Sequence, residues 1–419
     1  MNNSRLQHSF AALSIADIRL FIGSIGFFTL GSRALAVVVG FQIYQLTHAP
    51  LALGILGLVE AIPAISLVLV GGYAADHFNR RTILLITRAG SFLCALALAS
   101  ISWDGYGISV MGLYAVIFLA GIARGFADPA NTAFEAQVVP KHLTVSATSW
   151  IGSTWIGCSI IGPAVIGFVF DAAGAKGSYL LIASFFLLSW LCTAAIGPKP
   201  QIKPLHKEPL LKSIQVGWRF VFHHQPLLAS MSLDLFAVFF GGAMALLPVY
   251  AQDILKVGAK GLGFLNAAPS AGALLMMLMS TRYTPITHAG RNLLWTVTGF
   301  GISMIVFAFS KNFLLSIAAL MASGIFDGIS MVIRRSMVRL LSPDDMRGRI
   351  SAVSWIFITS SNELGAFESG LLAALIGTIP SVAVGGILTL TVVATTAFFA
   401  PQLRALEFDP RNLERKTNL

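Results

Sequence analysis

The sequence predicts an all-α membrane protein with twelve membrane-spanning helices in two pseudo-symmetric bundles of six. Three observations support this prediction. Of the 419 residues, 56% are hydrophobic and only 11% are charged, a balance that soluble domains do not show. Apolar runs, each near the roughly 20 residues that cross a bilayer, follow one another along the whole chain. Short motifs in the first half also recur at corresponding places in the second half.

Composition also narrows the function classes. A net charge of +10 would suggest nucleic-acid binding in a soluble chain, but here the basic residues gather in loops, where they indicate topology, and we expect no nucleic-acid partner. Cys94, Cys158 and Cys192 lie in apolar runs, which predicts buried thiols rather than disulfides. The segment 1–17 is polar and shows no signal-peptide cleavage pattern, so we expect the first apolar run to remain as a helix.

The apolar runs define the predicted spans and two domains. In chain order the spans cover 18–45, 51–75, 82–103, 107–130, 145–170, 177–196, 227–252, 260–281, 290–310, 312–338, 349–376 and 379–400. The strongest break in composition is the polar stretch 197–225, which is rich in Pro and Lys. It predicts a first six-helix bundle over 1–196, a cytoplasmic linker over 197–225, and a second bundle with a cytoplasmic tail over 226–419.

Basic residues set the predicted orientation. If both termini are cytoplasmic, most Lys and Arg outside the spans fall in the cytoplasmic loops and tails. The opposite loops then hold only Lys176, Lys256, Lys260 and Lys311. This asymmetry predicts a multi-pass protein of the bacterial cytoplasmic (inner) membrane with both termini inside.

Three pairs of motifs relate the two halves. Residues 57–63 (GLVEAIP) correspond to 263–269 (GFLNAAP), residues 121–125 (GIARG) to 324–328 (GIFDG), and residues 146–150 (SATSW) to 351–355 (SAVSW). The spacing is about 205 residues in each case, so the matches share one register. Duplicated halves of this kind are typical of transporters that bind substrate between two repeats.

The loop between the second and third spans, 71–82 (GGYAADHFNRRT), carries one acid and two arginines. Gly72 removes side-chain bulk where two helices approach closely. Asp76 is placed to accept hydrogen bonds from a helix N-terminus. Arg80 and Arg81 are able to pair with acids. On charge alone, an ordinary cytoplasmic loop explains these residues equally well.

The order of these residues resembles the loop between helices 2 and 3 of the major facilitator superfamily, written G-x-x-x-D-[RK]-x-G-[RK]-[RK]. His77 stands where Arg or Lys is usual, and Asn79 where Gly is usual. Because Asn tolerates a left-handed backbone, we expect the turn to survive. The resemblance implies the major facilitator fold and a gating role for this loop.

The predicted gate has two contacts. We expect Asp76 to face the start of the eleventh span near 348–351, and Arg80 to pair with Asp128 at the inner end of the fourth span. Both contacts would close the cytoplasmic side. The counterpart of this loop in the second half, 279–291, keeps Arg282 and Arg291 but has no acid.

Two charged residues are predicted to lie near the middle of the membrane. At roughly 1.5 Å per residue, Arg33 lies about 21 Å and Glu60 about 22 Å from the inner ends of their spans. They would be either a static ion pair between two helices or a pair in the transport cavity, opened by a proton or an anionic substrate. The second interpretation is favoured because a buried ion pair adds little stability by itself.

Other polar residues at membrane depth extend the candidate site. Arg124 and Asp327 occupy corresponding places in the two halves, so the halves offer opposite charges. Glu363 in the polar eleventh span is the first candidate for proton coupling, followed by Glu60 and Asp327. A carboxylate that only packs between helices is the alternative for Glu363. Arg334 and Arg335 are expected to anchor the inner end of the tenth span.

The predicted binding residues are Arg33, Glu60, Arg124, Asn266 and Asn362. Positive charges from the first half and acids chiefly from the second would give the cavity walls opposite signs. An anionic or zwitterionic amphipath could bridge the two walls.

The resemblance extends to a branch of the superfamily. Residues 42–48 (QIYQLTH), 217–221 (GWRFV), 263–269 and 342–349 (SPDDMRGR) look like the enterobactin-exporter-like branch. This implies a proton-coupled antiporter that exports a siderophore or a drug-like amphipath. Its partners would be a small-molecule substrate, protons and the lipid bilayer, and we expect a monomer. A transporter (flippase) of lysophospholipid or another lipid on the same fold is the alternative.

Enzyme classes lack the motifs they need. The sequence contains no phosphate-binding Gly-rich loop ending in Lys-Ser/Thr, no His-Glu-x-x-His and no Gly-x-Ser-x-Gly. We therefore expect no catalytic residues, no metal site and no cofactor.

Overall fold

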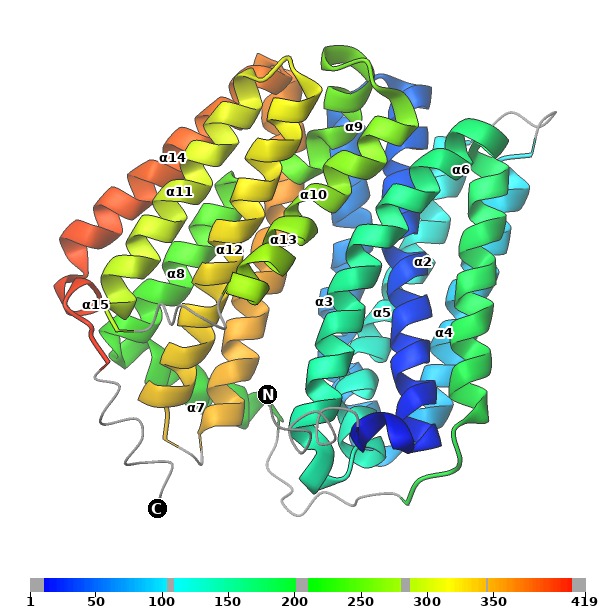
Figure 1. Ribbon diagram of the computed structural model, residues 1–419, viewed down its shortest axis with the longest axis horizontal. Helices are drawn as coiled ribbons and strands as arrows, with labels where there is room; N and C mark the ends of the chain where they lie inside the picture. Colours follow the sequence, from blue (N-terminus) through cyan, green and yellow to red (C-terminus); the bar gives the residue numbers. More distant parts are fainter. Residues whose placement is uncertain (1–10, 104–108, 201–209, 280–286, 344–345, 409–419) are drawn as a thin grey trace. The chain divides into compact units, whose positions relative to one another are not determined.

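The computed structural model describes residues 11–103, 109–200, 210–279, 287–343 and 346–408, and the long elements in these ranges are helices (Figure 1). In the first half they are α2 (Ala16–Thr47), α3 (Pro50–His77), α4 (Arg80–Ile101), α5 (Val110–Val138) and α6 (Thr144–Ala195). In the second half they are α7 (Leu210–His223), α8 (Gln225–Phe240), α10 (Gly258–Met279), α11 (Ala289–Phe309), α12 (Phe313–Leu341), α13 (Arg347–Ile376) and α14 (Thr378–Phe399). Shorter helices are η1 (Ala11–Ser14), η2 (Lys141–Leu143), η3 (Ala243–Leu246), α9 (Leu247–Val249), the π-helix η4 (Tyr250–Ile254) and α15 (Pro401–Arg404).

Within the described residues, ten helical stretches are long and apolar enough to cross a membrane. The stretch Lys141–Ala195 counts once, although Gly174 has φ 65° and interrupts the helical geometry of α6. Figure 1 shows α6 as two long arms joined at a turn. α13 is not among the ten, and it carries Glu363 and Glu368 in its second half. The difference from the predicted twelve spans lies in these two elements.

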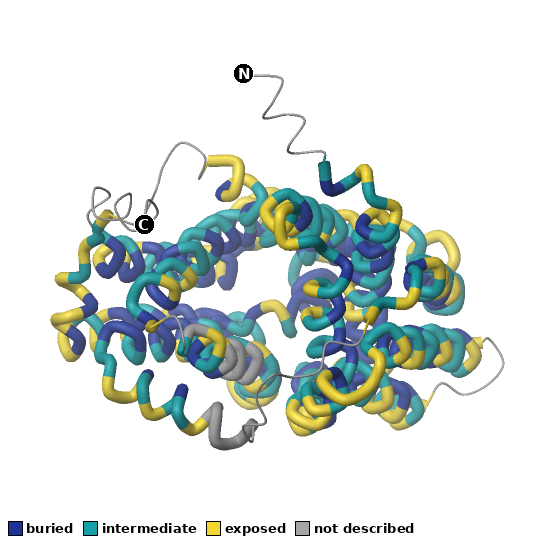
Figure 2. Tube along the Cα trace, turned by 90° about the horizontal axis from the view of Figure 1, so that it is seen from below, coloured by how far each residue is buried: buried dark blue, intermediate teal, exposed yellow. Residues whose placement is uncertain are grey.

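Large apolar side chains on the outer faces of the helices fit a lipid environment. Ile86, Leu93, Trp295 and Phe398 are among the exposed large hydrophobic residues. Figure 2 shows exposed positions on the outward surfaces of the helices and buried positions where helices meet. So many exposed apolar side chains would be unfavourable in water.

The chain divides into two compact units that do not follow the sequence halves completely. Unit 1 consists of Met1–His48, Leu58–His206 and Lys256–Ala267. Unit 2 consists of Ala49–Gly57, Lys207–Leu255 and Ala268–Leu419. Each unit therefore includes the first part of a helix from the other half, α10 in unit 1 and α3 in unit 2.

Each unit has its own apolar core. In unit 1, Ile18, Phe21, Leu84 and Phe134 are fully buried together, and the Phe21 and Phe134 rings meet edge to face at 5.7 Å. In unit 2 the core joins α8, α11, α12 and α13, and its members include Leu233, Leu293, Met337 and Ile350. In a bilayer such side chains stabilise the bundle by close van der Waals packing between helices rather than by leaving water.

The repeated glycine motifs produce equivalent helix contacts in the two units. In unit 1, a Cβ on Gly121 of α5 would lie 2.5 Å from the Glu60 carbonyl oxygen and 2.7 Å from Pro63, both on α3. In unit 2, a Cβ on Gly324 of α12 would lie 2.7 Å from Cα of Pro269 on α10. Only glycine permits such close approach of helix backbones, which explains why these glycines recur in both motifs.

Candidate functional site

The turn between α3 and α4 ends in a side-chain cap. Asn79 has φ −66° and ψ 115°, and its Oδ1 accepts hydrogen bonds from the backbone N–H groups of Arg81 and Thr82. Asn79 therefore begins α4 as an ordinary N-cap in extended backbone. The turn is present, but it does not use the left-handed backbone that was expected to let Asn replace Gly.

Both arginines of this turn bind carbonyl groups of neighbouring helices in unit 1. Arg80 donates to the carbonyl oxygens of Ala75 at 2.9 Å and Ala133 at 3.0 Å. Arg81 donates to the Ala194 carbonyl at 2.6 Å, in the last turn of α6. A cation at a helix C-terminus donates hydrogen bonds to carbonyl groups that have no partner within the helix, and it interacts favourably with the helix dipole. The turn thus fastens α4 to α5 and α6.

The predicted Arg80–Asp128 pair is not formed. Arg80 instead lies 4.0 Å from Asp76, four residues earlier. The reason is that α5 extends to Val138 and contains Pro129, so Asp128 lies well inside the helix rather than at its end. The predicted contact of Asp76 with 348–351 concerns residues of different units and stays a prediction.

The close helix approach predicted at Gly72 occurs at Gly71. A Cβ on Gly71 would lie 3.0 Å from Cα of Phe126 on α5, whereas nothing lies within 4 Å of a Cβ built on Gly72. Within unit 1, the close approach therefore lies one position earlier on α3 than predicted. Its proposed gating role is a separate matter and stays a prediction.

An arginine between two carboxylates forms the charge cluster of unit 1. The Arg124 guanidinium on α5 lies 3.0 Å from Glu60 on α3 and 3.7 Å from Asp128, one turn further along α5. The side chains are between 37% and 39% exposed. More than a third of each side chain is exposed, so the three charges are accessible rather than enclosed by protein.

Arg33 does not pair with Glu60, which corrects the predicted ion pair. Its guanidinium lies over the Trp155 ring of α6, 5.2 Å from the ring centroid, a cation–π arrangement. Equal depth on neighbouring helices made the Arg33–Glu60 pair plausible. Helix rotation decides the partner, however, and it turns Glu60 toward Arg124.

A second cluster of the same kind lies in unit 2. Arg334 of α12 pairs with Asp234 of α8, and it lies 3.8 Å from Asp327, two turns earlier on α12. Asp234 and Arg334 are 7% and 11% exposed, whereas Asp327 is 44% exposed. The prediction that Arg334 only anchors the end of the helix is wrong, because α12 continues to Leu341. Its neighbour Arg335 is exposed, as a surface anchor would be.

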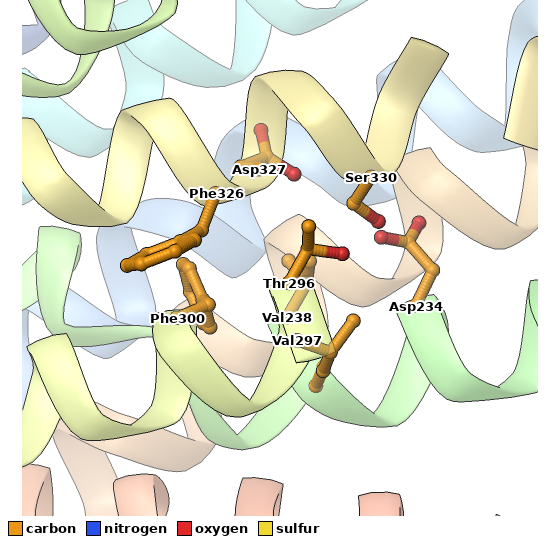
Figure 3. Close-up of a pocket in the computed structure, with 9 residues that line it drawn as sticks. Asp234, Val238, Thr296, Val297, Phe300, Phe326, Asp327 and Ser330 are labelled. Carbon is orange, nitrogen blue, oxygen red and sulfur yellow. The ribbon is translucent and has the colours of Figure 1, made fainter. Parts of the chain in front are cut away.

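A small pocket adjoins the unit 2 cluster, with room for about one water molecule. Figure 3 shows the rings of Phe300 and Phe326 at one end and the oxygen atoms of Asp234, Ser330 and Thr296 toward the other. The Thr296 hydroxyl donates to the Leu293 carbonyl at 2.8 Å, and Ser330 Oγ accepts from Nε of Arg334 at 3.3 Å. The pocket therefore combines two carboxylates with an aromatic wall, and Arg334, which pairs with both carboxylates, belongs to the adjoining cluster.

The remaining predicted residues lie on α10 and α13. Asn266 donates to the Leu262 carbonyl at 3.0 Å, and Asn362 donates to the Ile358 carbonyl at 2.8 Å, so each binds its own helix in this state. Asn362 is exposed and Glu363 is half-buried. Substrate binding by Asn266 and Asn362 and proton binding by Glu363 stay predictions.

Arg88, which the sequence reasoning missed, is fully buried on α4. It donates to Ser24 of α2 and to Asn131 of α5, the latter at 3.1 Å, and it lies over the Phe28 ring at 5.9 Å. The sequence indicates this residue by placing an arginine in the middle of the apolar run 83–101.

The sequence also contains an indication of the Arg334 cluster. Arg334 follows Asp327 by seven residues, or two helical turns, so both side chains lie on one face of the helix.

Comparisons with known proteins agree with this architecture. The Major Facilitator Superfamily model matches residues 21–366. The enterobactin exporter EntS of Escherichia coli O1:K1 / APEC is 24% identical over 357 residues, 84% of each chain. A D-xylose–proton symporter has a similar structure with a TM-score of 0.72 at 13% identity, over 93% of this chain and 99% of that one. A POT family transporter reaches a TM-score of 0.73 at 12% identity, over 92% and 96%.

The family model covers well over half of the chain, and both solved structures share its fold. The helical architecture and the membrane-length apolar helices agree with that assignment. The chain is a multi-pass membrane transporter for a small molecule and not an enzyme, and it belongs to the Major Facilitator Superfamily.

Proposed function

We propose that the protein is a proton-coupled antiporter that exports a siderophore or a drug-like amphipath by alternating access. The observation that carries this proposal is the presence of one arginine-centred charge cluster inside each unit of a transporter fold. Charged groups at membrane depth are costly and mark substrate or ion pathways. The relation to an enterobactin exporter supports efflux and this class of substrate.

The substrate is proposed to bind through its acidic and its apolar parts. Arg33 is exposed and lies against Trp155, so a positive charge and an aromatic surface adjoin. Arg124 of α5 and Glu60 of α3 form an ion pair, and both side chains are half-exposed. Asn266 and Asn362 would exchange their hydrogen bonds within the helix for bonds to the substrate. An anionic or zwitterionic amphipath has the chemistry that suits these groups.

Proton coupling requires a carboxylate that gains and loses a proton during the cycle. Glu363, Glu60 and Asp327 are the candidates, since each is a carboxylate inside a long helix of the transporter. Alternating access would be controlled on one side by Gly72, Asp76, Arg80, Arg81 and Asp128. The carbonyl contacts of Arg80 and Arg81 support a structured loop at this point.

The proposed topology has twelve spans, because α6 reverses at Gly174 and α13 is long enough to cross as well. The corresponding domains are 1–196 and 226–419, joined by the linker 197–225. Both termini are proposed to lie in the cytoplasm of a bacterium, with one chain acting alone in the inner membrane.

Reconstitution into liposomes tests the function directly. Enterobactin, a macrolide and a lysophospholipid would each be offered with and without a pH gradient. We expect gradient-dependent movement of enterobactin or the macrolide. Transport of the lysophospholipid alone, independent of the gradient, would instead identify a lipid flippase.

A further inference from the structure

The charge cluster of unit 2 holds one more negative than positive charge. Arg334 is the cation that Asp234 and Asp327 share. The face of α11 toward the pocket offers Thr296 and Phe300, which do not ionise. The ionisable groups on the described part of the neighbouring α13 include Glu363, Glu368 and Arg349. An uncompensated charge in a low-dielectric region is costly, so this cluster favours capture of one cation.

The two carboxylates are not equivalent. Asp234 and Arg334 are both nearly buried and form a close pair. Asp327 lies further from the guanidinium, at 3.8 Å, and its side chain is 44% exposed. The excess negative charge therefore resides on Asp327, which is also the more exposed of the two carboxylates.

The cluster of unit 1 differs in how its members are exposed. Arg124 is again shared by two carboxylates, Glu60 and Asp128. All three side chains are exposed to nearly the same extent, 37–39%, so neither carboxylate stands apart from the other as Asp327 does from Asp234.

We propose that Asp327 binds the coupling proton, with the Asp234–Arg334 pair as its fixed partner. This assignment rests on the proposed proton-coupled function and selects one of its candidate carboxylates. Hydronium from the aqueous phase gives a proton to a carboxylate oxygen of Asp327: an O–H bond of hydronium breaks, an O–H bond forms on Asp327, a water molecule remains and the cluster becomes neutral. Release to water reverses the step.

Loading this site also changes the link between two helices. Asp327 and Arg334 belong to α12, whereas Asp234 belongs to α8. While Asp327 is ionised it competes with Asp234 for the Arg334 guanidinium. Once Asp327 is neutral, Arg334 binds Asp234 alone, so the proton biases the contact between α8 and α12.

Infrared difference spectroscopy of the purified protein tests the site without requiring transport. On acidification the wild type should gain a carboxylic-acid C=O band. Asp327→Asn should lose this band, whereas Glu363→Gln and the surface control Arg335→Gln should keep it. Asp327→Asn removes the excess charge and leaves the Asp234–Arg334 pair intact, so we expect the variant to fold.

Transport in liposomes gives the second readout. Asp327→Asn should exchange substrate across the membrane without a gradient, but its gradient-driven accumulation should fall to the level of empty liposomes. Persistence of the infrared band in Asp327→Asn, or its loss in Glu363→Gln, would overturn the assignment. A wild type that shows the Asp327 band but no gradient-driven transport would support the proton site and refute the proposed function.

Discussion

The Arg124 guanidinium lies 3.0 Å from the Glu60 carboxylate, and this ion pair joins α5 to α3 at the place where Gly121 brings the two helices together. Both side chains are more than one third exposed. A pair this accessible contributes about 1 kcal/mol or less to stability, since solvent screens the charges. Its position inside a transporter is therefore better explained by a role in transport than by stabilisation of the fold.

Replacement of Glu60 by Gln should separate these two roles. The variant removes the negative charge but keeps the side-chain volume, so its free energy of unfolding should change by about 1 kcal/mol or less. Substrate transport in liposomes should fall strongly. Thermal unfolding in detergent and transport would be measured on the same preparation, and a large loss of stability with normal transport would contradict this interpretation.

Arg33 should govern charge selectivity. Within the described part of the chain no carboxylate lies within ion-pair distance of its guanidinium, which contacts the Trp155 ring instead. We expect Arg33→Ala to weaken transport of anionic amphipaths far more than that of cationic ones of equal size. Competition between matched anionic and cationic substrates measures this preference. If cations are preferred by the wild type and the variant leaves the preference unchanged, Arg33 has only a packing role.

Arg334 and Arg335 form a matched pair for a stability test. Arg334→Ala leaves the buried Asp234 without its partner, which should cost about 3–5 kcal/mol of unfolding free energy. Arg335→Ala removes an exposed arginine from the same helix and should have little effect. Equal melting temperatures for the two variants would show that the Asp234–Arg334 pair is not an important contact. In the double variant Asp234→Asn, Arg334→Gln, the removal of both charges should recover part of the stability.

Neighbouring glycines on α3 provide another internal control. Gly71→Ala forces a Cβ toward the backbone of α5 near Phe126, and this overpacking should cost about 1–3 kcal/mol. Gly72→Ala meets open space within 4 Å and should leave the unfolding free energy nearly unchanged. Chemical denaturation of both variants measures the difference. A transport defect in Gly72→Ala without loss of stability would support its proposed gating role.

The helical layout could be predicted well because hydropathy reports which segments prefer lipid. The span predicted over 82–103 is α4, Arg80–Ile101, and the one predicted over 290–310 is α11, Ala289–Phe309. Helix ends were less predictable. α5 continues to Val138 through Pro129 and several polar residues, a stretch whose composition is that of a loop.

Partner choice among the charged residues could not be predicted from depth alone. Glu60 is at the depth of Arg33, but the rotation of α3 turns it toward Arg124. Arg334 was assigned to a helix end because α12 was expected to stop at 338. Hydropathy does not report helix rotation, and rotation decides which charged groups meet.

Proton movement caused by substrate tests the central claim most directly. Liposomes containing the purified transporter and a trapped pH-sensitive dye, with an acidic lumen, would receive enterobactin from outside. Antiport requires that protons leave as substrate enters, so the lumenal pH should rise only when transporter and substrate are both present. Entry of radiolabelled enterobactin with no change in lumenal pH would contradict the account.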